Sequence, residues 1–514
     1  MIETELKFTL DAAGEARLRR HAGLEAMRLA PRRTQDLVSI YYDTPDQALA
    51  AAGMSLRLRK VGRRWIQTIK RRADDAGNGL FSNHETECPA PGGRLVPSGA
   101  DPAFAAVAEA RAGAPLAPLF ETRVRRTVER LGAPGGGEIE LALDRGTIVA
   151  GELTTPILEA EFELKAGDTG AVFEVARALF DQGPVRFATA NKSARGYALA
   201  RGAAVDEPLT ARTAGALKCA PSASVETVAR DVLRDCFAQI SRNMVVVAAS
   251  DMIEGPHQLR VGLRRLRTAL AVFSPSFGGG ATEPLNDEAR RLGQVVSGLR
   301  DLDVLIGDVA NLAELGLDDA ARDALLAALR DLREGRRAEV RAALAAPEAV
   351  GFLFDLGRFI EARGWLAPSD YDQTTRLAAP IAEVAPAILG KRRRKAMKLG
   401  RDVRNLDSEG LHTLRKELKK LRYAAEMFDS LFPARKVGVY LRALKDIQDS
   451  FGSMTDAAMA EGWLTGPDAP GHGSPDAQRA AGWVLGALAV QVRDDRPKLF
   501  ERWERLAKAD AFWP

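Results

Sequence analysis

Charged and uncharged side chains alternate along the first strand-like segment, and this alternation limits the folds open to the first half of the chain. Glu3, Glu5 and Lys7 share one face of the segment, and Leu6 and Phe8 share the other, because side chains two residues apart on a strand point the same way. A single strand of this kind is ordinary on a protein surface. Its recurrence in later segments predicts a small antiparallel barrel with an ionic interior.

The candidate ionic face contains nearly equal numbers of carboxylates and cations. Its members are Glu3, Glu5, Glu85, Glu87, Glu138, Glu140, Glu161 and Glu163, with Lys7, Arg57, Arg59, Lys70, Arg123, Arg125 and Lys165. Buried charges cost more than they return unless each is paired. Carboxylates suit Mg²⁺ or Mn²⁺, and arginine and lysine suit phosphate oxygens. A metal–polyphosphate complex would satisfy both sets, and an eight-stranded barrel leaves room for one.

The alternative is a half-buried sheet whose charges face water and pair across strands. That interpretation is the better one for any single pair of like charges. The whole set opens with Glu3-x-Glu5-x-Lys7 and ends with Glu161-x-Glu163-x-Lys165, which favours the ionic interior.

Composition excludes several classes of protein. A chain of 514 residues, 46% hydrophobic and 28% charged, is typical of a globular protein with more than one domain. It has no apolar run near the roughly 18 residues of a membrane span and no signal-peptide pattern. Three cysteines without a CxxC pair suit a reducing cytosol, so we expect a cytoplasmic protein without a membrane partner. No aromatic platform is interleaved with basic residues, which argues against nucleic acid.

The first 202 residues resemble the CYTH family, also called triphosphate tunnel metalloenzymes. The motifs that carry the resemblance are Glu3-x-Glu5-x-Lys7, Ser55-Leu56-Arg57-Leu58-Arg59, Gln67-Thr68-Ile69-Lys70, Arg123-x-Arg125, Glu161-x-Glu163-x-Lys165 and Lys192-Ser193-x-Arg195-Gly196-Tyr197. The resemblance implies an α+β domain built on an eight-stranded antiparallel tunnel. It also implies hydrolysis or cyclisation of triphosphate compounds with Mg²⁺ or Mn²⁺.

The same resemblance implies roles for individual residues. The expected metal ligands are Glu3, Glu5, Glu161 and Glu163, and the expected catalytic residues are Lys7, Glu3 and Glu5. The expected triphosphate ligands are Lys7, Arg57, Arg59, Lys70, Arg123, Arg125, Lys165 and Arg195. Glu85, Glu87, Glu138, Glu140 and Asp144 would position basic residues or help to hold a second metal.

The composition changes after residue 202. Residues 203–222 have the composition of a linker, and residues 223–514 follow helical spacing without a strand pattern, which predicts an all-α domain. An internal repeat aligns residues 257–273 with residues 412–428 without gaps. The repeat predicts two pseudo-symmetric helical bundles.

Helical geometry places the basic residues of each repeat in one stripe. At about 100° per residue, His257, Arg260, Arg264 and Arg267 fall within a stripe about 80° wide, beside an apolar stripe that should face the core. The matching residues are His412, Arg415, Lys419 and Arg422, and Lys416 beside them is a further predicted polyphosphate ligand. Two such helices would form a surface for a linear polyanion. The alternative is a solvated basic face paired with neighbouring acids.

This half resembles the CHAD domain, which implies binding of inorganic polyphosphate. Together the two resemblances predict a metal-dependent inorganic triphosphatase with a polyphosphate-binding helical domain, and an association with polyphosphate granules. Two alternatives stay open: a class IV adenylyl cyclase-like enzyme, and a protein that binds polyphosphate without catalysis.

Overall fold

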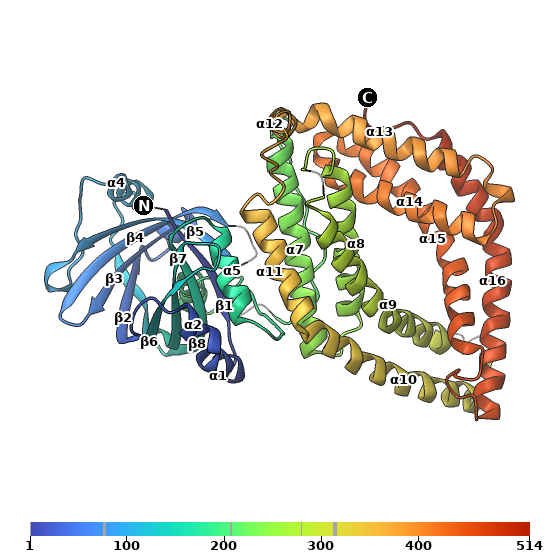
Figure 1. The fold of residues 1–514 in the computed structure, drawn as a ribbon, viewed down its shortest axis with the longest axis horizontal. Coiled ribbons are helices and arrows are strands. Elements are labelled where there is room, and N and C mark those ends of the chain that lie inside the picture. The colour runs from blue at the N-terminus through green and yellow to red at the C-terminus, as the bar shows by residue number, and fades with distance from the viewer. Residues whose placement is uncertain (1, 76–78, 206–207, 279, 312–315) are drawn as a thin grey trace. The chain divides into compact units, whose positions relative to one another are not determined.

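The computed structural model describes residues 2–75, 79–205, 208–278, 280–311 and 316–514. The chain divides into two compact units (Figure 1). The first contains the residues up to Thr210 together with Ala345–Gly364, and the second contains Ala211–Leu344 and Trp365–Pro514.

The first unit is built on a closed antiparallel barrel (Figure 1). Its described strands are β1 (Ile2–Thr9), β2 (Arg33–Asp43), β3 (Met54–Val61), β4 (Arg64–Asp75), β5 (Leu80–Pro89), β6 (Ala117–Gly132), β7 (Glu138–Ala150) and β8 (Leu153–Ala166). Around the barrel they follow the order β1-β5-β4-β3-β2-β6-β7-β8. The expected eight-stranded barrel is therefore confirmed.

Glycine-containing turns set the register of the strand pairs. Gly62 between β3 and β4 and Gly151 between β7 and β8 have φ of 59° and 58°, which a residue without a side chain adopts at little cost. The first and last strands close the barrel, and their pairing sets Lys7 of β1 opposite Glu161 of β8. Interior charges on neighbouring strands therefore meet directly across the ladder.

The two faces of the barrel wall have opposite character. Leu6, Phe8 and Phe162 are fully buried on the outer face, where α5 (Gly170–Leu179) contributes apolar side chains to the same core. The other helices of this unit are α1 (Ala12–Arg20), α2 (Ala22–Met27), α3 (Ala48–Ala51), α4 (Pro102–Arg111), α6 (Lys192–Ala200), α11 (Pro347–Glu361) and the 3₁₀ turn η1 (Pro91–Gly93). Burial of this outer face leaves the charged face to form the interior.

Helix α11 belongs to the first unit although its sequence lies within the second half of the chain. Its Phe354 ring lies 5.9 Å from the ring of Phe8 and 5.9 Å from that of Phe180. Glu174 of α5 accepts an ion pair from Arg358 of α11 at 2.8 Å. The helix therefore completes the apolar core outside the barrel wall.

The described residues of the second unit form helices joined by loops, which confirms the all-α expectation (Figure 1). They are α7 (Val225–Ala249), α8 (Glu254–Phe273), α9 (Glu283–Asn311), α10 (Asp319–Ala345), α12 (Gln373–Ala378), α13 (Ile381–Leu399), α14 (Ser408–Met427), α15 (Ala434–Leu464) and α16 (Pro475–Lys508), with 3₁₀ turns η3 (Val403–Asn405) and η4 (Asp429–Leu431). Among the described helices, none combines the length and apolar composition needed to cross a bilayer.

The internal repeat corresponds to the helices α8 and α14. Each contains 20 residues, and the matched residues Phe273 and Phe428 touch, with ring centroids 6.2 Å apart. Contact between equivalent residues is what a two-fold relation produces at its axis. The basic stripes of the two helices are thereby brought to the same region of the unit.

Candidate functional site

The barrel interior holds a cavity of about 260 Å³ with a polar lining. Its wall is formed by Glu3, Glu5, Lys7, Gln35, Tyr41, Ser55, Arg57, Arg59, Lys70, Asn83, Glu85, Glu87, Arg126, Glu140, Ala142, Glu161, Glu163, Lys165, Asn191, Lys192 and Ser193. Within this lining, Ala142 is the exception to a set of charged, amide and hydroxyl side chains, and Tyr41 adds an aromatic ring that carries a hydroxyl group. The cavity is thus suited to a compact, highly charged ligand.

Most of the site residues predicted from the sequence meet in this cavity. These are Glu3, Glu5, Lys7, Arg57, Arg59, Lys70, Glu161, Glu163 and Lys165. Glu85, Glu87 and Glu140 also line it, whereas Glu138 pairs with Arg130 and is not part of the wall. The alternation of charge along the strands is therefore the pattern that identified the cavity.

Arg123 and Arg125 do not line the cavity. The Arg123 side chain is 65% exposed and pairs with Glu121 at 2.5 Å, and Arg125 is exposed. The inner face of β6 carries Arg126 instead, because even-numbered residues of this strand segment point inward. The prediction that Arg123 and Arg125 belong to the site is therefore wrong, and Arg126 is the arginine of β6 that lines the cavity.

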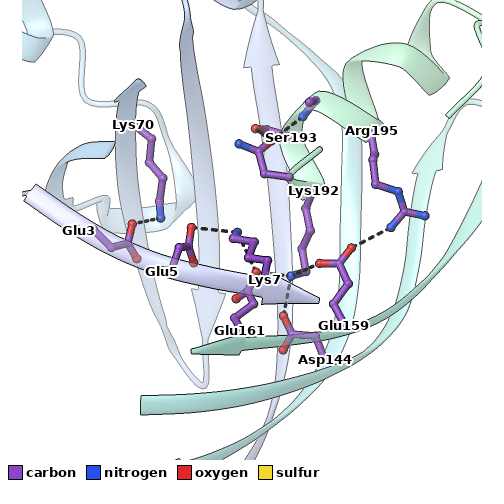
Figure 2. Close-up of polar contacts among 12 residues, drawn as sticks. Glu3, Glu5, Lys7, Lys70, Asp144, Glu159, Glu161, Lys192, Ser193 and Arg195 are labelled. Atoms are coloured by element: carbon purple, nitrogen blue, oxygen red, sulfur yellow. Dashed lines mark hydrogen bonds and ion pairs between the residues drawn. The ribbon is translucent and has the colours of Figure 1, made fainter. Parts of the chain in front are cut away.

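Arg195 also lies outside the cavity wall, although it is buried. Its guanidinium donates to Glu159 at 2.8 Å and to the Pro156 carbonyl at 2.9 Å. Figure 2 shows Arg195 reaching Glu159 from α6. Arg195 therefore does not face the cavity. It pairs with Glu159, which in turn contacts the cavity residue Lys192.

Lys192 is the principal site residue that was not predicted. It begins α6, and its ammonium lies 2.8 Å from Asp144, 2.8 Å from Glu159 and 2.7 Å from Glu161 (Figure 2). The lysine stood in the motif Lys192-Ser193-x-Arg195, but a helix start gives no periodic signal of where its side chain points. Only the fold brings it to three carboxylates.

The buried ions around Glu161 form one network. The Lys7 ammonium lies 2.9 Å from Glu5 and 2.9 Å from Glu161, and Arg126 lies 2.6 Å from both Glu161 and Asp144. Burial opposes the charged form of Lys7, but Glu161 and Glu5 hold its pKa above the usual value. Burial likewise opposes the charge on Glu161, but Lys192 and Lys7 hold the pKa of that carboxyl well below its usual range. Both groups are therefore charged at neutral pH.

One side of the cavity carries excess positive charge. Burial, with Arg57 and Arg126 nearby, lowers the pKa of Arg59 to about 10. Burial would raise the pKa of Tyr41, but Arg57 and Arg59 hold it below the usual value. The Arg57 Nε atom is buried and has no hydrogen-bond partner among the described residues. This side is ready to accept anionic oxygens.

The opposite side carries a row of carboxylates. The backbone register sets Glu5 of β1 opposite Glu163 of β8, and Glu163 opposite Glu140 of β7, and like charges in such positions repel. Burial raises the pKa of Glu163 to about 6; Glu3 and Glu5 add to the shift, and Lys165 opposes it.

These oxygens suit a hard divalent cation, which would relieve the repulsion. Within the described residues, no three carboxylate, histidine or cysteine side chains already converge on one point. Lysines occupy the carboxylates instead: Lys70 contacts Glu3, and Lys165 contacts Glu163 at 2.5 Å (Figure 2 shows the Lys70 contact). The donor set therefore fits Mg²⁺ or Mn²⁺ if the lysines turn toward a bound anion.

The predicted basic residues of the helical unit also gather. We use the name α8–α14 basic surface for a set of half-buried or exposed residues on these two helices. Its members are His257, Arg260, Arg264, Arg267, His412, Arg415, Lys416, Lys419 and Arg422. Burial and the charges of Arg264 and Arg415 lower the pKa of Lys419 to about 6. The two stripes are thus close enough to repel one another.

Partners of these cations are unevenly distributed. Arg260 pairs with Asp301 at 2.9 Å and Arg422 with Glu426 at 2.9 Å. In the described part of the chain, Arg264, Arg415 and Lys419 have no carboxylate within ion-pair distance. Burial, with neighbouring cations, lowers the pKa of both His257 and His412. Asp456 attracts Arg415 and Lys419 from beyond ion-pair distance. Positive charge is therefore in excess at the centre of the surface.

Comparison with known proteins gives both halves of the chain a family. The CYTH domain model matches residues 1–197, and the CHAD domain model matches residues 231–465. The crystal structure of the CHAD domain from the plant Ricinus communis superposes with a TM-score of 0.51 and 25% identity, covering 59% of this chain and 98% of that one.

Two curated relatives cover different parts of the chain. An inorganic triphosphatase of Haemophilus influenzae is 34% identical over 163 residues, 32% of this chain and 46% of that protein, so the chain spans about half the length of this relative. An uncharacterized protein of Mycobacterium tuberculosis is 27% identical over 449 residues, 81% of this chain and 80% of that protein. The chain contains a CYTH domain followed by a CHAD domain.

Proposed function

We propose that this protein is a metal-dependent inorganic triphosphatase, which hydrolyses triphosphate to pyrophosphate and phosphate, and that its helical domain binds inorganic polyphosphate. The observation that carries the proposal is the cavity, in which a cationic side faces a row of carboxylates. The similarity to the inorganic triphosphatase of Haemophilus influenzae supports the same reaction.

The basic residues of the cavity are proposed to bind the phosphate groups. Arg57, Arg59 and Arg126 would hold phosphate oxygens with their guanidinium forks, and Lys70 and Lys165 would leave their carboxylates to join them. Phosphoryl transfer depends on such positioning and neutralisation more than on covalent help. The cavity therefore supplies the main requirement of the reaction.

Glu3, Glu5 and Glu163 would hold Mg²⁺ or Mn²⁺. Glu161, which the sequence also predicts as a metal ligand, is paired with Lys7, Arg126 and Lys192 and would orient these cations instead. When bound, the metal polarises a phosphoryl oxygen. Lys7 is charged at neutral pH, because Glu161 and Glu5 stabilise its ammonium. Lys7 therefore acts by holding negative charge, and does not accept a proton in the resting state.

The cavity favours an inorganic substrate over a nucleotide. Among the described lining residues, Tyr41 is the aromatic one. Its ring is already stacked on the ring of Phe120, with centroids 4.5 Å apart. Among the described residues, the lining offers no apolar compartment for a base, so this part of the cavity lacks the nucleoside site that an adenylyl cyclase needs. The proposal of inorganic triphosphate as substrate follows from this lining.

The helical domain is proposed to bind polyphosphate on the α8–α14 basic surface. Arg264, Arg415 and Lys419 lie close together without paired carboxylates, and a chain of phosphates would supply the missing charge. Binding there would keep polyphosphate near the protein and would suit a cytoplasmic protein associated with polyphosphate granules.

Phosphate release from inorganic triphosphate tests the catalytic proposal. Wild type, Glu161→Gln and the outer-face control Glu121→Gln are assayed with Mg²⁺, Mn²⁺ or EDTA. We expect release that disappears with EDTA and in Glu161→Gln, and that is retained in Glu121→Gln. Cyclic AMP formation from ATP would support the cyclase instead. Tight polyphosphate binding without phosphate release under any metal would support the binding protein.

A further inference from the structure

A second, separate cavity lies along helix α13 in the helical unit. It has a volume of about 610 Å³ and is lined by Pro386, Ala387, Gly390, Arg393, Arg394, Met397, Lys398, Arg401, Ala511, Trp513 and Pro514. We call it the α13 groove. Its size falls in the range of about 300–1,000 Å³ that is usual for small-molecule sites.

The basic side of the groove comes from the run of residues 391–404. Arg394 and Lys398 are four residues apart on α13 and share one helical face, and Arg401 follows in the turn after the helix ends at Leu399. All three are exposed. In the described part of the chain, these three side chains make no ion pair, and no acidic side chain lines the groove. Their positive charge is therefore available to a ligand.

Two acidic residues, Glu417 and Glu504, form ion pairs with basic residues that do not line the groove. Glu417 lies 3.2 Å from Lys395 and 2.7 Å from Lys420, and Glu504 lies 3.0 Å from Arg404. None of these five residues lines the groove. Within the described residues, the basic residues that line the groove therefore keep their positive charge unpaired, because Glu417 and Glu504 are paired with basic residues outside the groove.

The opposite side of the groove is apolar and fixed in place. Trp513 is 7% exposed and packs edge-to-face on Tyr440 and Phe512, at 5.3 and 4.7 Å. Arg393 donates to the Ala509 carbonyl at 3.0 Å, which ties this segment to α13. The indole therefore forms a wall that does not depend on a ligand, and Met397 of α13 adds an apolar side chain to the lining.

Gly390 gives the groove its depth. A Cβ atom at this position would lie 3.3 Å from the Arg394 guanidinium and 3.8 Å from the Trp513 indole nitrogen. A methyl group is thus nearly accommodated, whereas a longer side chain would project between the basic and apolar walls. This offers a way to block the groove without changing its charge.

We infer that the α13 groove is a binding site for an organic phosphate, in which a phosphate chain contacts Arg394, Lys398 and Arg401 and an apolar body lies against Trp513 and Met397. A nucleoside triphosphate has both parts and serves as the probe. Inorganic polyphosphate would use only the basic wall. The site is distinct from the barrel cavity and from the α8–α14 basic surface, with which it shares no residue.

Photolabelling of the full-length protein with 8-azido-ATP in EDTA tests the site directly. After digestion, mass spectrometry should find label on the peptides that contain Met397 or Trp513. Excess ATP should displace this label at a concentration at least tenfold lower than tripolyphosphate. Label confined to other peptides would overturn the site, and equal displacement by the two competitors would overturn the organic ligand.

Variants separate the groove from general positive charge. Gly390→Leu, and the double variant Lys398→Ala with Arg401→Ala, should each weaken groove labelling at least tenfold. The matched double variant Lys391→Ala with Lys395→Ala removes two charges from the same helix outside the groove and should keep labelling within about twofold. Circular dichroism confirms that each variant is folded. Equal loss in the matched control would overturn the proposal.

Discussion

Two adjacent arginines of β6 lie on opposite faces of the barrel wall. Arg125 is exposed on the outer face, whereas Arg126 contacts Asp144 and Glu161 at 2.6 Å inside it. The side-chain period of two makes this contrast unavoidable. It also provides a natural control, because two neighbouring arginines can be changed separately.

Arg126→Gln should lower kcat/KM for triphosphate by about 100-fold, because a charge-assisted contact in a buried site contributes roughly 2–3 kcal/mol. Arg125→Gln should leave kcat/KM within about twofold. Initial rates with Mg²⁺ measure both. A similar loss in the two variants would show that the inner and outer faces are not distinguished in this way.

Lys419 should make polyphosphate binding depend on pH. Its pKa is lowered to about 6 by burial and by Arg264 and Arg415, with Arg260 and Arg422 adding to the shift. Asp456 faces the same lysine, and burial raises its own pKa although Arg415 opposes this. The free protein therefore holds Lys419 uncharged above pH 6, and a bound polyanion would restore its proton.

Affinity for polyphosphate should consequently fall as pH rises from about 6 to 9, with uptake of a proton on binding. Calorimetry in buffers of different ionisation enthalpy measures this uptake. Lys419→Met should remove most of it, while the exposed control Lys420→Met should retain it. Proton uptake that is unchanged in Lys419→Met would assign the effect to another group.

At the scale of elements, the strands β1, β8 and β7 set carboxylates in one row. Glu5, Glu163 and Glu140 face one another because the hairpin turn at Gly151 and the β1–β8 pairing fix the register. A shift of one residue in any strand would turn its carboxylate to the other face. The row is therefore a property of the pairing as much as of the residues.

Glu163→Gln should raise the Mg²⁺ concentration for half-maximal activity at least tenfold, because it removes one anionic ligand. In the wild type, Mg²⁺ should raise the thermal unfolding midpoint above that in EDTA, because it relieves the repulsion in the row. The variant should lose most of this shift. Glu152→Gln, in the exposed β7–β8 turn, should keep it; a retained shift in Glu163→Gln would argue against the row as the metal site.

At the scale of the whole molecule, one segment belongs to a structural unit that its position in the sequence does not indicate. The sequence assigns domains to residues 1–202 and 223–514, and these functional boundaries stay a prediction. By contacts, however, Ala345–Gly364 joins the barrel unit, where Val350 and Phe354 enter the core with Phe8 and Phe162. The barrel unit is therefore completed by a helix from far along the chain.

Phe354→Ala should destabilise the barrel unit by about 3–5 kcal/mol, the usual cost of emptying a buried aromatic site. The surface variant Arg358→Ala on the same helix should cost about 1 kcal/mol or less, because its ion pair is partly exposed. Thermal unfolding of the full chain, followed by the loss of triphosphatase activity, measures both. Equal effects would mean that α11 is not part of this core.

The sequence by itself determined the two faces of the strands, the helical second half and the repeated basic stripe, because each is a local periodicity. This periodicity is enough to place Glu3, Glu5, Lys7, Glu161 and Glu163 together on one face of the sheet. Tertiary structure alone decided which phase of β6 faces inward, that Lys192 meets three carboxylates, and that α11 closes the barrel core. A period of two defines two faces but does not say which one is buried; strand register and long-range packing decide that, and neither is written in a local pattern.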